Sequence, residues 1–260
     1  MNGSQRIAEA FSSCDKRAAL MPYLMGGYPD IDGSLAIANG YADAGADLIE
    51  LGVPFSDPLA DGPVIQSAAT VALAAGSTLD AVLGVARAMS ERVPVVLMAY
   101  SNIILARGIE QFVGDLVAAD VCGLIVPDLP VEESELLSAS TQSAGIALIP
   151  LAAPTSTDAR LAEIGRQARG FLYTVAVSGT TGERGEQSDY GEVLARVRQH
   201  TELPVALGFG ISTPEQAAAA ADAGADGVIV GSRLVREALE QPQPAQACKA
   251  LVEQFAAALR

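Results

Sequence analysis

The regular recurrence of short apolar segments along the whole chain is the feature that most constrains its fold. Eight segments are rich in Val, Ile, Leu and Ala, and they are apolar at nearly every position rather than at alternate ones. Parallel strands that are buried on both faces have this character. We therefore expect strands at Ala19–Met25, Leu48–Gly52, Pro94–Tyr100, Gly123–Val126, Ile146–Leu151, Phe171–Val177, Pro204–Gly208 and Gly227–Val230.

The stretches between these segments have the composition and period of amphipathic helices. The clearest are Gly108–Ala119, Val131–Ser143, Asp158–Ala168 and Pro214–Ala223. Alternation of strand and helix through eight units predicts an α/β protein, a closed (β/α)₈ or TIM barrel.

The length of the chain suits one such barrel. No linker or low-complexity tract interrupts the 260 residues, so we expect a single TIM-barrel domain over residues 1–260. Two helices fall outside the repeating units. One, around Ser4–Ser13, is expected to close the bottom of the barrel, and the other, around Gln246–Leu259, to end the chain.

Composition excludes several classes of function. Half of the residues are hydrophobic and 18% are charged, which excludes a disordered chain. The net charge of −15 repels phosphate backbones and anionic lipid, so we expect no nucleic-acid and no membrane partner. A small phosphorylated ligand remains possible, because backbone N–H groups bind phosphate without Lys or Arg.

Cysteine and histidine usage limits the chemistry further. The three cysteines, Cys14, Cys122 and Cys248, are far apart and of odd number, which favours reduced thiols in the cytoplasm. The N-terminus carries no apolar signal core, so no export signal is expected. With His200 as the single histidine, we expect neither a histidine-based metal site nor a Ser-His-Asp triad, and we interpret His200 as solvated.

Two carboxylates fall where barrel enzymes carry their chemistry, at the carboxyl ends of strands. Glu50 lies inside the apolar second strand, where burial would raise its pKa and suit it to general acid catalysis. The alternative is a structural Glu bonded to the backbone or to a neighbouring Ser or Tyr. Asp61 ends the loop that follows this strand and could face Glu50 across a pocket. The alternative, which also applies to Asp57 in the same loop, is a turn or helix-cap residue.

Glycines follow the seventh and eighth strands. Gly208-Phe209-Gly210 and Gly231-Ser232 each precede a helix, so their backbone N–H groups could bind a phosphate at the helix N-termini. The alternative is that these glycines serve only tight turns. We interpret Arg233, next along the chain, as solvated.

The sixth strand leads into a long polar loop punctuated by glycines, Ser178–Glu186. A loop of this kind can close over a ligand, or it can be a surface loop without such a role. Tyr173 in the strand points either into the barrel or into the helix layer, and periodicity does not decide between them.

The segment Glu50–Gln66, ELGVPFSDPLADGPVIQ, closely resembles the signature of the tryptophan synthase α chain family. The resemblance covers the full length of the chain. Leu20–Pro29 is similar to the family's first strand and Val126–Pro130 to its fourth-strand exit. Ser178–Gly182 is similar to its mobile loop, and the two glycine segments are similar to its phosphate site.

This resemblance implies a carbon–carbon lyase of tryptophan biosynthesis. Indole-3-glycerol phosphate would undergo retro-aldol cleavage to indole and glyceraldehyde 3-phosphate, without a cofactor in this chain. The indole would pass to a β chain that uses pyridoxal phosphate, in an α2β2 heterotetramer. Glu50 would be the acid–base carboxylate and Asp61 would hold the indole N–H. Substrate contacts would come from Tyr173, Thr181, Gly182, Gly210, Gly231 and Ser232.

Two positions depart from the family pattern. Many members carry an acid before Pro29, where this chain has Tyr28, so the role of Tyr28 is left open. Thr180 stands where Val is usual, a change compatible with a surface loop. Asp57 and the Pro127–Pro130 loop match family positions near the β-chain interface.

Two other classes of protein stay open at this point. A sugar-phosphate epimerase or an indole-glycerol-phosphate synthase would need a metal-binding His/Asp set or a lysine at a strand end. This chain has one histidine, and its lysines, Lys16 and Lys249, lie outside the expected strands. A non-catalytic barrel subunit that only binds and activates a partner chain would be expected to lack Glu50 or Asp61, and both are present.

Overall fold

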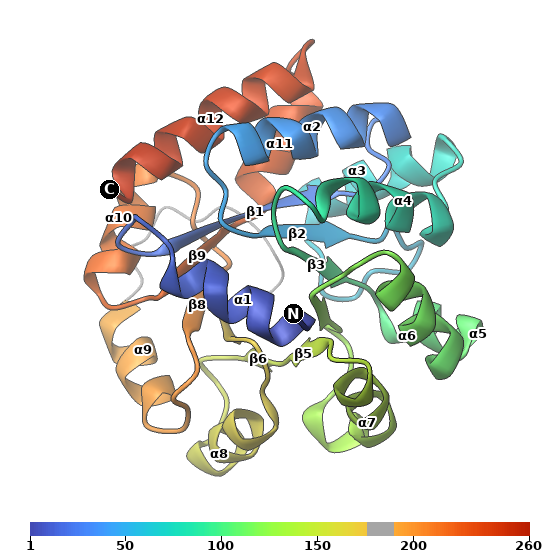
Figure 1. Ribbon diagram of the computed structural model, residues 1–260. Helices are drawn as coiled ribbons and strands as arrows, with labels where there is room; N and C mark the ends of the chain where they lie inside the picture. Colours follow the sequence, from blue (N-terminus) through green and yellow to red (C-terminus); the bar gives the residue numbers. More distant parts are fainter. Residues whose placement is uncertain (176–189) are drawn as a thin grey trace.

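A ring of helices surrounds a central set of parallel strands (Figure 1). The computed structural model describes residues 1–175 and 190–260. The strands of this part of the chain are β1 (Ala19–Met25), β2 (Ile49–Gly52), β3 (Val95–Met98), β4 (Gly123–Ile125), β5 (Ala147–Ile149), β6 (Leu151–Ala152), β7 (Leu172–Val175), β8 (Val205–Gly208) and β9 (Gly227–Val230).

The strand order confirms the predicted TIM barrel. The order is β5-β4-β3-β2-β1-β9-β8-β7-β6, and every pairing is parallel. The two ends of this order, β5 and β6, are consecutive pieces of the one strand predicted at Ile146–Leu151. Pro150 separates them because it has no N–H to give to a ladder. Its carbonyl still accepts the Tyr173 N–H at 3.2 Å, so the interrupted strand completes the ring.

The described helices are α1 (Gly3–Ser12), α2 (Ile31–Asp43), α3 (Pro63–Ala74), α4 (Leu79–Met89), α5 (Ser101–Arg107), α6 (Ile109–Ala118), α7 (Glu135–Ser143), α8 (Asp158–Gln167), α9 (Tyr190–Arg198), α10 (Pro214–Asp222), α11 (Ser232–Glu240) and α12 (Pro244–Ala258). The prediction of one helix over Val131–Ser143 was wrong in its first turn. A 3₁₀ turn, Val131–Glu133, precedes α7, and the Ser134 hydroxyl donates to the Val131 carbonyl at 2.8 Å. Such a local side-chain bond competes with regular helix.

Helix α1 covers the amino-terminal ends of the strands, as predicted. It lies across the strands in Figure 1. Ile7 is fully buried, and the ring of Phe11 packs 5.7 Å from that of Phe171. Gly123 and Gly227 open β4 and β9, where a Cβ would lie 3.1 Å from Ile7 and 3.0 Å from Phe11. Glycine at these strand starts therefore lets α1 approach closely, which leaves the carboxyl ends of the strands as the open end of the barrel.

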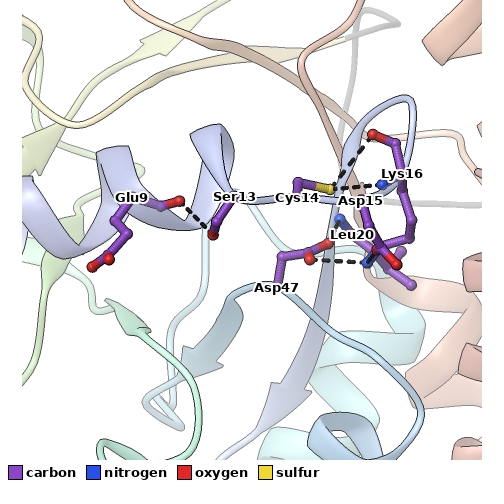
Figure 2. A network of polar contacts seen from close by, with 7 residues as sticks. All are labelled: Glu9, Ser13, Cys14, Asp15, Lys16, Leu20 and Asp47. Carbon is purple, nitrogen blue, oxygen red and sulfur yellow. Dashed lines mark hydrogen bonds and ion pairs between the residues drawn. The ribbon is translucent and has the colours of Figure 1, made fainter.

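A buried ion pair joins the starts of β1 and β2 (Figure 2). The Lys16 ammonium lies 2.9 Å from Asp47 Oδ1, and Asp47 Oδ2 accepts the Leu20 N–H at 2.7 Å. The side chain of Lys16 is only 5% exposed. Its second carboxylate, Asp15, is 3.4 Å away and 77% exposed, so Asp47 is the partner that compensates the buried charge.

Two further features concern the helices and the cysteines. No single helix in residues 1–175 and 190–260 is long and apolar enough to cross a membrane. Only α3 and α4 taken together reach that length and hydrophobicity, and the two helices are bent by 106° relative to each other. All three cysteines are free, and Cys122 and Cys248 are buried.

Replacing Asp47 by Ala should lower the free energy of unfolding by about 3 kcal/mol, because Lys16 and the Leu20 N–H would both lose a buried partner. Urea unfolding followed by circular dichroism measures this loss. The matched control is Asp15→Ala, which removes the exposed neighbour of the same ammonium and should cost less than about 1 kcal/mol. Equal losses in the two variants would contradict the assignment.

Candidate functional site

A cavity opens at the carboxyl ends of the strands, and it gathers residues that are far apart in the sequence. Six residues expected at the site line it together: Glu50, Asp61, Tyr173, Gly210, Gly231 and Ser232. Apolar side chains form much of the remaining wall, among them Ile65, Met98 and Ile229. The cavity thus combines an apolar wall with a small number of polar groups, which is typical of a small-molecule site.

Glu50 is buried in the barrel wall. Strand β2 directs it to the inside, and the ladders place Tyr23 of β1 and Val96 of β3 beside it. The side chain is 4% exposed, and its Oε1 atom has no hydrogen-bond partner among the described residues. Burial, followed by the charge of Asp61, raises the pKa of Glu50 to about 8. Glu50 is therefore predominantly protonated near neutral pH.

Asp61 lies in the same cavity with a different acidity. Burial raises its pKa to about 6, and interaction with the Tyr100 hydroxyl opposes that rise. Tyr100 also holds the loop itself: its hydroxyl accepts the Ala60 N–H at 3.1 Å, and its ring stacks 5.3 Å from Phe55. Near neutral pH the cavity therefore holds one neutral carboxyl group and one carboxylate, an arrangement suited to divided roles.

Two tyrosines lean over glycines of the adjacent strands and enclose Glu50. A Cβ on Gly52 would overlap the Tyr23 hydroxyl, and a Cβ on Gly208 would overlap that of Tyr173. Tyr173, whose direction was left open by the sequence, thus points into the cavity, where its ring meets Phe209 edge-on at 5.9 Å. Burial and the charge of Glu50 both raise the pKa of Tyr173, which keeps the phenol neutral.

The two helix starts near the glycines differ. In α10, the Gln216 side chain accepts the N–H groups of Ser212 and Thr213, and Thr213 caps the helix in return. Helix α11 begins at Ser232 with Gly231 as its N-cap and no side-chain cap. Its first N–H groups have no partner within the helix, and they carry the positive end of its dipole. The α11 start is therefore the better anion site of the two.

Gly210 reaches the same cavity through an unusual backbone. Phe209 and Gly210 have φ angles of 63° and 94°, so the chain turns sharply directly after β8. The turn places the backbone of Gly210 in the cavity wall with Gly231 and Ser232.

Several expected residues lie elsewhere. Asp57 is exposed and accepts the Ser56 hydroxyl at 2.5 Å, as a turn residue does. Arg233, interpreted as solvated, instead pairs with Glu237 at 2.7 Å on its own helix. Tyr28 does not line the cavity; its buried hydroxyl donates to the Ala238 carbonyl of α11 at 3.3 Å. Thr181 and Gly182, like Thr180, lie outside the described residues.

Sequence reasoning did not single out Tyr23, which lines the cavity, or Tyr100, whose hydroxyl interacts with Asp61. Tyr23 sits in a strand that is buried throughout, and only the β1–β2 register places it beside Glu50. Tyr100 is the last residue of the strand predicted at Pro94–Tyr100. An aromatic hydroxyl at the end of an otherwise aliphatic strand is the signal that could have found it. In the described part of the chain, no group of three His, Cys, Asp or Glu side chains could hold a metal ion.

The fold and the cavity define a class: a TIM-barrel enzyme with two carboxyl groups of unequal acidity beside an open helix N-terminus. A family model described as tryptophan synthase alpha chain matches residues 10–260. The chain belongs to the tryptophan synthase alpha chain family. It is a lyase of tryptophan biosynthesis that cleaves indole-3-glycerol phosphate to indole and glyceraldehyde 3-phosphate.

Individual members of this family are similar to the chain over most of its length. The tryptophan synthase alpha chain of Synechococcus elongatus is 52% identical over 228 residues, 86% of each chain. That of Gloeobacter violaceus is 49% identical over 236 residues, 89% of this chain and 86% of the relative.

Solved structures are also similar. Tryptophan synthase of Mycobacterium tuberculosis matches with a TM-score of 0.91 at 39% identity, covering 98% of both chains. The tryptophan synthase α2β2 complex of Pyrococcus furiosus matches with a TM-score of 0.83 at 34% identity, covering 92% of this chain and 98% of that chain.

Replacing Ser232 by Asp should raise the KM for indole-3-glycerol phosphate by about tenfold or more, because a carboxylate at the α11 start would repel the phosphate. Steady-state kinetics measure this change. The matched control is Ser212→Asp at the capped start of α10, which should change KM much less. A similar KM increase in both variants would contradict the preference for α11.

Proposed function

We propose that the cavity is the site at which this chain cleaves indole-3-glycerol phosphate. In this proposal Glu50 is the acid–base group, Asp61 binds the indole N–H, and the α11 start with Gly210, Gly231 and Ser232 binds the phosphate. The observation that carries the proposal is the pair of carboxyl groups in one cavity, with pKa values raised to about 8 and about 6.

The reaction follows from the different states of these two groups. Protonated Glu50 gives its proton to C3 of the indole ring, which becomes a cation. The Asp61 carboxylate accepts a hydrogen bond from the ring N–H and stabilises this charge in a cavity of low polarity. Glu50, now ionised, takes the proton of the hydroxyl on the adjoining side-chain carbon.

Cleavage restores the starting state of the protein. As the carbon–carbon bond breaks, its electron pair returns to the ring and neutral indole forms. The side-chain carbon becomes the aldehyde of glyceraldehyde 3-phosphate. Glu50 ends protonated, as it began, because the one proton that it gives to C3 is replaced by the one that it takes from the hydroxyl group.

The cavity walls fit the two ends of this substrate. Ile65, Met98 and Ile229 offer an apolar surface for a flat ring, and the α11 start offers N–H groups for the phosphate. Tyr173 contributes to the wall beside Glu50. From the family resemblance we also assign Thr181 and Gly182 to substrate binding.

The partner of this chain is a tryptophan synthase β chain, and we propose that it docks beside the mouth of the barrel. Three strongly exposed leucines follow three consecutive strands there: Leu59 after β2, Leu105 in α5 and Leu136 in α7, at 81%, 66% and 75% exposure. Exposed apolar groups of this kind in neighbouring loops suit a protein interface.

We further propose that residues 1–260 form one domain and that the protein works in the cytoplasm. The family model extends over residues 10–260 without a break, which supports the first point. The three free cysteines fit a reducing compartment, which supports the second.

The pH dependence of indole release tests the catalytic assignment. In the wild-type chain kcat/KM should fall below pH about 6, where Asp61 becomes protonated, and above pH about 8, where Glu50 ionises. Asp61→Asn should lower turnover strongly. It should also move the alkaline limb to lower pH, because the negative charge that raises the pKa of Glu50 is gone.

Glu50→Gln is the matched variant in the same assay. It should reduce turnover by about a thousandfold or more, because an amide cannot exchange the proton. Binding of inorganic phosphate to the same variant, followed by calorimetry, should stay as in wild type. Retained indole formation would overturn the proposed mechanism.

Replacing Leu59 by Asp should weaken binding of the β chain by about tenfold or more, because a charge would be buried in an apolar contact. Titration of the β chain, followed by calorimetry, measures the Kd. The control is Val117→Asp, at the far end of α6, where a side chain of 52% exposure lies away from the mouth. Unchanged affinity in Leu59→Asp would contradict the docking site.

A further inference from the structure

The loop after β4 holds a carboxylate that the chemistry above does not use. Asp128 Oδ1 accepts the Ser101 N–H at 2.8 Å, and its Oδ2 accepts the Ser101 hydroxyl at 2.7 Å. Ser101 is the first residue of α5, and the N-cap residue of that helix, Tyr100, makes no side-chain cap. Asp128 therefore caps α5 from the loop of a neighbouring strand.

The residue just before this cap reaches the candidate catalytic loop. Tyr100 is 3% exposed and contacts the β2–α3 loop in three ways. Its ring stacks on Phe55, its hydroxyl accepts the Ala60 N–H, and the same hydroxyl interacts with the Asp61 carboxylate. Because Tyr100 and Ser101 are adjacent, fixing the Ser101 backbone fixes the origin of the Tyr100 side chain.

Asp128 and its neighbour Pro127, in the loop after β4, line two different cavities. Its neighbour Pro127 lines the cavity that holds Asp61. Asp128 itself lines a second cavity, formed with residues of α7 and α8 such as Ser138 and Gln167. The carboxylate therefore stands behind the wall of the site rather than inside it, so it has no direct contact with a bound substrate.

We propose that Asp128 is a positioning residue for Asp61: by capping α5 at Ser101, it holds Tyr100 in the contacts that fix the Asp61 loop. The proposal rests on the role assigned to Asp61 above. It adds a residue that acts on the reaction through hydrogen bonds of 2.8, 2.7 and 3.1 Å across three successive strand exits.

Loss of the cap should change catalysis in a specific way. The titratable groups around Asp61 are Glu50 of β2, Tyr23 of β1 and Tyr100 after β3, and Asp128 faces Tyr100 from the β4 exit. Of these, the Tyr100 hydroxyl is the group that lowers the pKa of Asp61. If Tyr100 shifts, this pKa rises above about 6, and the acid limb of kcat/KM moves to higher pH. The α11 phosphate site is not part of this chain of contacts, so binding of inorganic phosphate should change little.

The experiment compares indole release from the purified full-length chain and its variants as a function of pH. Asp128→Ala should lower kcat by about tenfold, with an acid limb at higher pH, because it removes both bonds to Ser101. Asp128→Asn keeps one acceptor and should recover most of the loss. Ser101→Ala removes only the hydroxyl bond and should fall between wild type and Asp128→Ala.

Two further variants separate positioning from stability. Glu132, four residues after Asp128, has a carboxylate that pairs with Arg160 at 3.0 Å. Glu132→Gln removes this ion pair and should leave kcat and the acid limb unchanged. Tyr100→Phe removes the hydroxyl, so adding Asp128→Ala to it should produce no further shift of the acid limb. A purely structural role would lower the melting temperature and leave the acid limb in place.

The outcomes distinguish this inference from the proposed function. If Asp61→Asn is impaired while Asp128→Ala keeps the wild-type kcat and acid limb, the positioning role is overturned and the role of Asp61 stands. If Asp61→Asn turns over normally, the catalytic assignment fails and the positioning role fails with it.

Discussion

The cavity of this protein is built around one carboxyl group that is buried inside the barrel wall. Glu50 is 4% exposed, and its Oε1 atom has no partner in the described part of the chain. Ionisation there costs free energy, because water no longer solvates the charge and no cation replaces it. The carboxyl group therefore holds its proton near neutral pH. A barrel strand is what makes such burial possible, since its neighbours on both sides are fixed by the ladder.

The other groups of the cavity surround Glu50 and differ from it in charge and polarity. Asp61, on a loop, keeps some contact with solvent and with the Tyr100 hydroxyl, so its pKa stays lower than that of Glu50, and near neutral pH one of the two groups is neutral and the other charged. Gly52 and Gly208 leave room for Tyr23 and Tyr173 to enclose Glu50. The α11 start, where Gly231 makes no side-chain cap in the described part of the chain, offers positive potential without a cation, and we propose that it binds the phosphate of the substrate of this acidic protein.

The two ends of the barrel are specialised by different interactions. At the amino-terminal end, α1 packs closely on strand starts opened by glycine, and the Lys16–Asp47 pair joins β1 to β2. At the other end, loops after β2, β3 and β4 are tied to one another through Tyr100 and Asp128. Because α1 covers the amino-terminal end, the mouth is the open end, where we propose that the substrate and the β chain bind.

The sequence by itself determined the barrel, its closing helix α1 and the family, because buried parallel strands are apolar throughout and the Glu50–Gln66 motif is specific. It also singled out Glu50, since a carboxylate in an apolar strand is rare, and it pointed to Asp61 through the family motif in the following loop. Tertiary structure decided the direction of Tyr173, the place of Tyr23 beside Glu50 and the difference in capping between the α10 and α11 starts. Strand register and cap contacts join residues distant in sequence, and local pattern carries no information on which of them meet.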